Sequence, residues 1–173
     1  MDEVSSRVPL LVQWHGRIAP GTSSDALVQN IDFAPTLLAA AGVKPKMPMH
    51  GVSLLPLLVA DLATDPEPWH RDLYYHFYEN PGFHGVARHY GVRPARYKLV
   101  YYYQNDEWEL FDLQTDRGDQ VNLYGRPGYD DIISDLKRRL QTLRTQYEVP
   151  ETDQQAPWYH DAMVRAIEQL MLW

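Results

Sequence analysis

Aromatic and β-branched residues gather in four short runs in the middle of the chain. The runs span residues 72–78, 86–92, 97–103 and 107–113, and Tyr, Val, Phe and Trp fill them, as is typical of strands on a pleated, half-buried surface. Turn-forming residues separate the runs. Connections this short join antiparallel neighbours, because a parallel return needs a dozen or more residues. The pattern therefore predicts a four-stranded antiparallel sheet with at least one face covered by a helix.

That helix is predicted from about Tyr129 to Tyr147. Apolar residues recur there at alternating spacings of three and four, which indicates an amphipathic helix: Ile133, Leu136, Leu140, Leu143 and Tyr147. We expect Pro150 to end this helix and its basic residues to form a solvated face. Together these elements predict an α+β domain, and the tail at 151–173 has the apolar spacing of a further helix.

The first third of the chain predicts a strand and two helical segments. Val8–Trp14 is a continuous apolar run, as in a buried strand. A helix is expected after Asp32, which can cap it, and before Gly42, which can end it. Residues 53–58 predict a short apolar helical turn, and residues 61–69 a boundary before the sheet.

Composition excludes several classes of partner and site. The formal net charge is -7, which argues against a nucleic-acid surface. The chain has no cysteine, so it has no disulfide, thiolate metal site or thiol nucleophile. No apolar run approaches the roughly 18 residues of a membrane span.

No complete reaction centre is recognisable. The chain has no Gly-rich phosphate loop, no His-Glu-x-x-His, no Gly-x-Ser-x-Gly and no clustered Asp/Asn metal box. We therefore assign neither catalytic nor metal-binding residues to this chain.

Two histidines at the start of the predicted sheet form the best candidate binding site. His84 and His89 lie in and beside its first turn, and Arg88 and Arg93 add cationic donors. Imidazole and guanidinium groups beside aromatic rings suit a sulfated or phosphorylated sugar, since charged donors bind the anion. The alternative is an ordinary sheet surface with cross-strand pairs. His76, between Tyr75 and Phe77, is expected to be a core histidine held by one partner.

Several blocks of the chain resemble the late part of a type I sulfatase of the alkaline-phosphatase superfamily. The first blocks are Arg7–Gly16 (RVPLLVQWHG), Val28–Leu38 (VQNIDFAPTLL) and Gly51–Leu57 (GVSLLPL). Further blocks resemble the C-terminal subdomain of bacterial enzymes of the N-sulphoglucosamine sulphohydrolase and N-acetylglucosamine-6-sulfatase kind: Arg88–Arg93 (RHYGVR), Arg96–Leu99 (RYKL) and Trp108–Leu113 (WELFDL).

The resemblance implies a division of the chain. Residues 1–58 would be the closing strand and helix of an α/β catalytic domain, residues 70–150 the smaller C-terminal subdomain, and residues 151–173 a tail. The implied function is the C-terminal part of a sulfatase that hydrolyses sulfate esters of sulfated saccharides and completes the substrate pocket. The alternative is a non-catalytic carbohydrate-binding or interaction module.

The resemblance also implies what must come from elsewhere. Such sulfatases use calcium and a formylglycine made from Cys or Ser in a Cys/Ser-x-Pro-x-Arg motif, and this chain has no such motif. We therefore expect no cofactor in this chain, no turnover by the chain alone, and a missing N-terminal catalytic part as its partner. For the intact bacterial enzyme a periplasmic or secreted location is implied.

Overall fold

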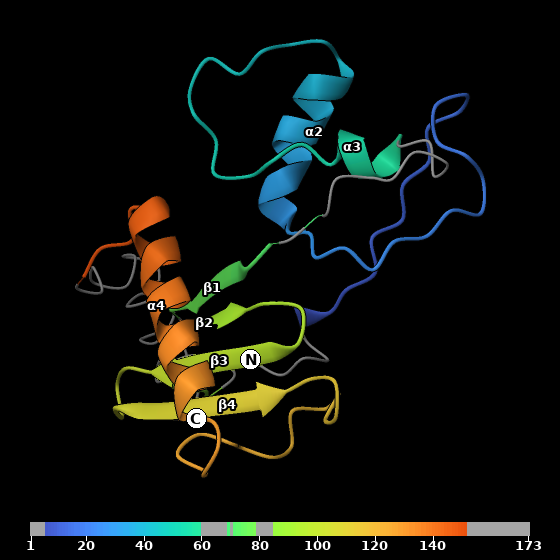
Figure 1. Ribbon diagram of the computed structural model, residues 1–173. Helices are drawn as coiled ribbons and strands as arrows, with labels where there is room; N and C mark the ends of the chain where they lie inside the picture. Colours follow the sequence, from blue (N-terminus) through green and yellow to red (C-terminus); the bar gives the residue numbers. More distant parts are fainter. Residues whose placement is uncertain (1–5, 60–68, 70, 79–84, 152–173) are drawn as a thin grey trace, which may run out of the picture. The chain divides into compact units, whose positions relative to one another are not determined.

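The computed structural model describes residues 6–59, 69, 71–78 and 85–151 (Figure 1). The chain divides into two compact units. The first comprises Arg7–Leu73, and the second contains the chain from Tyr74 onward. Each unit is described by itself.

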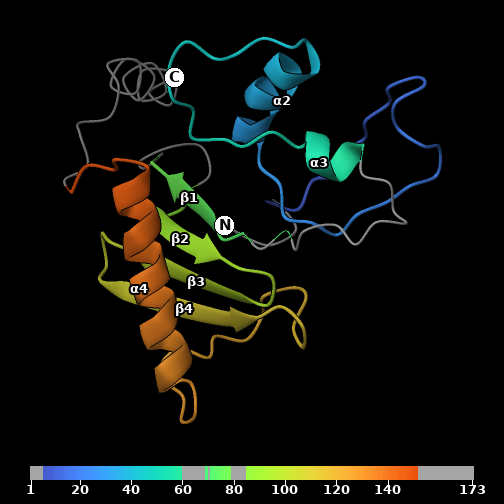
Figure 2. The same cartoon turned by 45° about the horizontal axis from the view of Figure 1, so that its top comes forward.

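The predicted four-stranded sheet is confirmed. Its strands are β1 (Leu73–Phe77), β2 (His89–Arg93), β3 (Tyr97–Tyr102) and β4 (Glu107–Asp112), in the spatial order β1-β2-β3-β4 (Figures 1 and 2). The pairs β2–β3 and β3–β4 are antiparallel.

Strand β2 begins three residues later than predicted. The run was expected to start at Val86, but the N–H of Arg88 donates to the Gln104 side chain at 2.6 Å. Within β2, Gly91 lies opposite Val100. A Cβ at Gly91 would come within 2.5 Å of the Leu99 carbonyl oxygen, so only glycine fits here without a shift.

The predicted amphipathic helix is also confirmed as α4 (Asp130–Gln146), which lies across one face of the sheet in both views (Figures 1 and 2). Its apolar stripe meets the inward side chains of the central strands. The shared core consists of Val92, Leu99, Leu110, Ile133, Leu136, Leu140 and Leu143. Burial of each large apolar side chain contributes about 1.5–3 kcal/mol, an upper estimate.

The helix α4 ends within one residue of the predicted Tyr147, but Pro150 does not make the stop. The helix stops at Gln146, before Pro150, because Glu148 adopts a left-handed backbone with φ 52°. The N–H of Val149 then donates to the Arg144 carbonyl at 2.9 Å, and that of Glu148 to the Thr145 carbonyl at 3.1 Å. These two bonds form a Schellman motif, which satisfies the last helical carbonyls.

A smaller core covers the opposite face of the sheet. Val100, Phe111 and Leu113 are buried there, with Tyr75 and Tyr102 packed against them. On the same strands Lys98 is 2% exposed, forms an ion pair with Asp119 and lies over the ring of Phe111.

The outer edge of β4 is covered by the following loop. The N–H of Leu110 donates to the Asn122 side chain at 3.0 Å, and the N–H of Leu123 donates to the Leu110 carbonyl at 2.8 Å. Satisfying the edge in this way hinders pairing with another chain.

The Arg7–Leu73 unit contains the 3₁₀ turn η1 (Asn30–Asp32), α2 (Phe33–Ala40) and α3 (Leu55–Leu58). The last two confirm the predicted helix and helical turn. Asp32 occupies the predicted N-cap position of α2, but its side chain makes no capping hydrogen bond to that helix. Its fully buried carboxylate accepts from the N–H groups of Gln29 and Val52, at 2.8 and 3.0 Å, and forms an ion pair with Arg71.

The predicted buried strand at Val8–Trp14 is wrong for the described structure. The segment belongs to no strand, and Val8 and Leu11 are among its exposed residues. Phe33 and Leu37 of α2 are exposed as well. The prediction of a buried strand assumed a neighbouring layer, and the described residues provide none.

Candidate functional site

The predicted binding residues lie on and before β2, apart from His84, which is outside the described residues. His89 opens β2 and is 1% exposed. Its ring stacks on Phe77 with centroids 5.2 Å apart, and lies 5.9 Å from Tyr75 and 4.9 Å from Tyr102. His89 Nδ1 is 2.8 Å from the Ala87 carbonyl oxygen, so this nitrogen carries the proton and donates it.

The two arginines are more accessible than His89. Arg88 and Arg93 are half-buried, and Arg93 donates a hydrogen bond of 3.1 Å to the carbonyl of Pro94. Strand alternation puts His89 and Arg93 on the same sheet face, opposite α4, about 13 Å apart along the strand. The described residues therefore give a face with one buried imidazole and one accessible guanidinium, and no tight cluster of the predicted donors.

The α4 face of the sheet carries an aromatic group that the sequence did not predict as one unit. His76 lies between two tyrosine hydroxyls, at 3.0 Å from Tyr74 and 3.4 Å from Tyr103, rather than with the single partner expected. Its ring also stacks on Tyr78 with centroids 3.7 Å apart. Alternation of Tyr and His along β1 was the signal for this cluster, because every second side chain shares a face.

Two basic residues of α4 extend this aromatic group instead of joining the predicted solvated face, whereas Arg138 is exposed as expected. Arg144 lies over the Tyr90 ring, and Lys137 lies 4.1 Å from the ring centre of Trp108. Burial raises the pKa of Tyr90, and the nearby Arg144 charge partly opposes the shift. Tyr90 is therefore a neutral hydrogen-bond partner at neutral pH.

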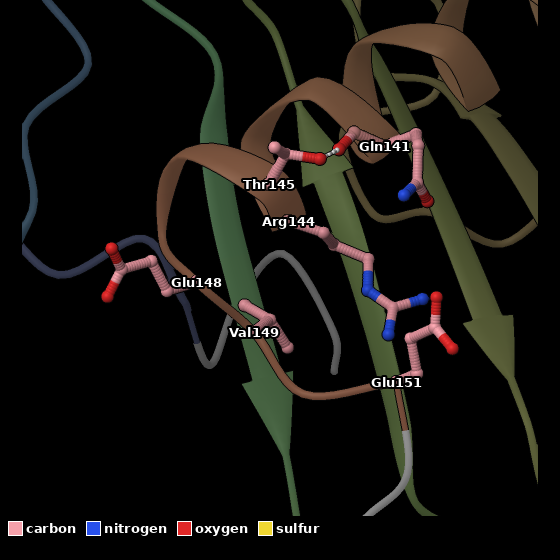
Figure 3. Close-up of a pocket in the computed structure, with 6 residues that line it drawn as sticks. All are labelled: Gln141, Arg144, Thr145, Glu148, Val149 and Glu151. Carbon is pink, nitrogen blue, oxygen red and sulfur yellow. Dashed lines mark hydrogen bonds between the residues drawn. The ribbon is translucent and has the colours of Figure 1, made fainter.

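A hollow of about 400 Å³ lies at the end of α4 (Figure 3). Its lining residues are Gln141, Arg144, Thr145, Glu148, Val149 and Glu151. Arg144 supplies its cation, but that guanidinium already donates to the Tyr90 hydroxyl and, at 3.2 Å, to the Pro150 carbonyl. With two carboxylates beside one engaged cation, the hollow does not favour an anionic sugar.

The described residues contain neither a cluster suited to a metal ion nor a helix that could span a membrane. Across the described residues, no three His, Cys, Asp or Glu side chains come close enough together to hold a metal ion. Among those residues, too, no helix has the length and apolarity needed to cross a membrane.

Comparisons with known proteins show which protein family this chain is similar to. Residues 1–146 match the family described as N-sulphoglucosamine sulphohydrolase, C-terminal. The chain is 37% identical over 155 residues to an N-acetylglucosamine-6-O-sulfatase of Bacteroides thetaiotaomicron, a match that covers 89% of this chain and 28% of that protein. It is 29% identical over 171 residues to bovine arylsulfatase A, covering 84% of this chain and 32% of that protein.

A solved structure agrees with the sequence matches. A protein in complex with its substrate D-glucosamine-2-N,6-O-disulfate superposes with a TM-score of 0.73 and 36% identity, over 80% of this chain and 28% of that one. The chain thus spans about a third or less of the relatives that it matches. It belongs to the sulfatase family, as the C-terminal region of N-sulphoglucosamine sulphohydrolase-type enzymes.

Proposed function

We propose that this chain is the C-terminal part of an enzyme that hydrolyses sulfate esters of sulfated saccharides and that it completes the substrate pocket. The observation that carries the proposal is the match of residues 1–146 to the N-sulphoglucosamine sulphohydrolase family. The 37% identity to an N-acetylglucosamine-6-O-sulfatase and the similarity to a protein bound to a disulfated glucosamine favour a sulfated amino sugar as substrate.

In this proposal the reaction chemistry comes from the part of the enzyme that precedes these residues in the relatives. Family sulfatases use calcium and formylglycine. This chain has no cysteine and no Ser-x-Pro-x-Arg sequence, and its described residues hold no metal cluster. The residues present do not fit either group, so the proposed role of this chain is recognition and support.

The proposed division of the chain gives residues 1–58 to the catalytic α/β domain, residues 70–150 to the C-terminal subdomain, and residues 151–173 to a tail. The first segment exposes large apolar side chains, including Leu37 at 70%. Exposed apolar area of this kind is typical of an interaction surface.

Within the subdomain, we propose that Arg93 binds the anionic part of the saccharide and that Arg88 is a further member of the site. Accessible guanidinium groups hold sulfate through charge-assisted hydrogen bonds. His84 and His89 remain predicted members of the same site. The burial of His89 favours a supporting role, in which its ring packs among Phe77, Tyr75 and Tyr102 and holds the start of β2.

A free-standing carbohydrate-binding module is not favoured. Such a module would need the sheet and α4 alone, yet the family match also includes residues 1–58.

The proposal is tested by a fusion of this chain to the N-terminal part of the Bacteroides relative, in place of that protein's own matched region. We expect the fusion to release sulfate from N-acetylglucosamine-6-sulfate, while the N-terminal part alone does not. A fusion that unfolds cooperatively and contains formylglycine by mass spectrometry, but releases no sulfate from any sulfated amino sugar, would overturn the proposal.

A further inference from the structure

A row of hydrogen-bond donors runs along one side of α4. Lys137, Gln141 and Thr145 follow one another at a spacing of four residues, and Arg138 and Arg144 each lie three residues from Gln141. Side chains at these spacings are neighbours on the surface of a helix. These five residues, the donor row, are all exposed or half-buried, so a ligand can reach them from solvent.

The centre of the donor row is positively charged. Arg138 is 71% exposed and pairs with Asp135, and Arg139 bonds the same carboxylate at 3.4 Å. One carboxylate therefore serves two arginines, and Lys137 beside them adds a third cation. A guanidinium has five N–H donors. Among the described residues Arg138 uses its donors only toward Asp135, so most of them remain for a ligand.

Aromatic side chains hold Lys137 in place. Its ammonium lies 4.1 Å from the ring centre of Trp108 and donates to the Tyr124 hydroxyl at 2.8 Å. An ammonium has three donors, so two remain after this bond. Because the side chain is already ordered, a ligand that binds it costs less conformational entropy.

The hollow at the end of α4 continues the donor row with a different chemistry (Figure 3). Gln141, Arg144 and Thr145 belong to both, and Glu148 and Glu151 add two exposed carboxylates. Carboxylate oxygens accept hydrogen bonds, whereas an amide both donates and accepts them. The hollow therefore suits the hydroxyl groups of an uncharged sugar ring. Gln141 is one helical turn from Lys137, about 6 Å along the axis.

This order of cations and carboxylates distinguishes between polyanions. A nucleic acid carries a charge at every nucleotide, so a strand bound at Lys137 and Arg138 would bring further phosphates beside Glu148 and Glu151. Like charges at such separations repel. A sulfated saccharide instead carries its anionic groups among hydroxyl groups, and those hydroxyls can donate to the carboxylates.

We propose that the donor row and the adjoining hollow form a second saccharide site, which holds a sulfated oligosaccharide outside the substrate pocket. A sulfate binds Lys137 and Arg138, and the hydroxyls of the next sugar contact Gln141 and Glu148. The site lies on the α4 side of the sheet, whereas Arg93 lies on the opposite face. This inference rests on the proposed function for its class of ligand, and it adds a surface that retains a polymeric substrate.

Binding of an oligosaccharide to the 173-residue chain tests the proposal. The probe is a sulfated hexasaccharide of alternating glucosamine and uronic acid, prepared from heparin, and its chemically desulfated form is the comparison. In calorimetric titrations we expect the sulfated probe to bind about tenfold more tightly or better, since charge-assisted hydrogen bonds are the stronger ones. NMR amide signals of residues 134–148 should shift. Equal affinity for the two probes, or shifts confined to other residues, would overturn the proposal.

Charge-matched variants distinguish a site from general attraction. Arg138→Gln should weaken binding of the sulfated probe by roughly tenfold through loss of a charged donor, and its exposed position leaves the core intact. Arg117→Gln removes the same charge from an exposed loop and should leave the affinity unchanged. Similar weakening by both variants would show that only net charge matters, which contradicts the proposal.

Glu148→Gln has opposite consequences for a saccharide site and for a simple positive patch. Removal of a negative charge strengthens binding of any polyanion if charge alone acts. At the proposed site the variant instead loses a charged acceptor for sugar hydroxyls, so we expect weaker binding of the sulfated probe. Single-stranded DNA should bind the parent chain more weakly than the probe does. Tighter binding of the probe by the variant, or of DNA by the parent, would overturn the proposal.

The second site and the proposed function can fail separately. A fusion that releases sulfate from N-acetylglucosamine-6-sulfate, together with a chain that does not bind the hexasaccharide, keeps the proposed function and removes the second site. Binding at α4 without sulfate release by the fusion does the reverse.

Discussion

The guanidinium of Arg144 donates a hydrogen bond of 2.7 Å to the hydroxyl of Tyr90, and its carbon lies 4.4 Å from the centre of the same ring. Arg144 is in the last turn of α4, and Tyr90 is in β2. One side chain therefore joins the end of the helix to the sheet, through a charge-assisted hydrogen bond and a cation–π contact.

We expect Arg144→Gln to lower the free energy of unfolding. Loss of a hydrogen bond from a charged donor and of a cation–π contact should cost about 1–2 kcal/mol at a partly exposed site. Tyr90→Phe removes the hydroxyl and keeps the ring. Urea unfolding of both single variants and the double variant gives the coupling energy, and a value near zero would show that the two contacts do not stabilise the protein.

Truncation of the core should destabilise the sheet–helix unit strongly. Leu136 of α4 is 2% exposed and packs in the core with Val92 and Leu99. Leu136→Ala is expected to lower the free energy of unfolding by about 2–5 kcal/mol, as for other buried leucines. The control is Thr142→Ala, an exposed position on the same helix. Similar midpoints for the two variants in a chemical denaturation would contradict the assignment of α4 to the core.

The ion pair between Arg96 and Asp112 should make stability depend on pH in the acid range. Arg96 donates to both carboxylate oxygens, at 3.0 and 2.7 Å, and the Gln114 N–H donates at 3.1 Å. The Arg96 hydrogen bond is the largest cause that lowers the pKa of Asp112, and the backbone hydrogen bonds add to it.

Because the folded pKa lies below the unfolded value of about 3.9, the carboxylate stabilises the fold above about pH 4. That stabilisation is lost as the pH falls through the folded pKa. Asp112→Asn should therefore unfold at lower temperature at pH 7 and show a smaller loss of Tm between pH 5 and pH 3. Equal pH dependence in the variant and the parent would disprove this role.

Arg93 should affect substrate affinity more than stability. In the fusion described above, Arg93→Ala is expected to raise KM for a sulfated amino sugar roughly tenfold to a hundredfold, since one hydrogen bond to a charged group contributes about 1.5–3 kcal/mol. Arg117→Ala, at an exposed loop arginine, is the control. An unchanged KM with an intact fold would remove Arg93 from the proposed site.

Local pattern was sufficient to predict the sheet–helix unit. The aromatic runs and the spacing of Ile133, Leu136, Leu140 and Leu143 reflect contacts made within that unit, so β1–β4 and α4 follow from the sequence. The position of the end of α4 was predicted to within a residue, but its cause was not: a left-handed Glu148 makes the stop instead of Pro150, and this residue type gives little signal for that conformation.

The first unit was harder to predict because the burial expected from its apolar residues is absent among the described residues. Val8–Trp14 has the composition of a buried strand, but burial depends on partners that the described residues lack. Asp32 is a residue type that often caps a helix with its side chain. Here its carboxylate instead forms an ion pair with Arg71 and accepts a hydrogen bond from the N–H of Val52, both far along the chain. At the candidate site, the sequence predicted His89 in a strand and Arg93 just after it, whereas both lie in β2. It also did not reveal that the imidazole is enclosed by aromatic rings.

The most direct test of the account is sulfate release by the isolated chain and by the fusion, assayed side by side on N-acetylglucosamine-6-sulfate with calcium present. We predict no release by the isolated chain and calcium-dependent release by the fusion. Release of sulfate by the purified 173-residue chain would contradict it, because the chain would then contain reaction chemistry that we assign to the rest of the enzyme.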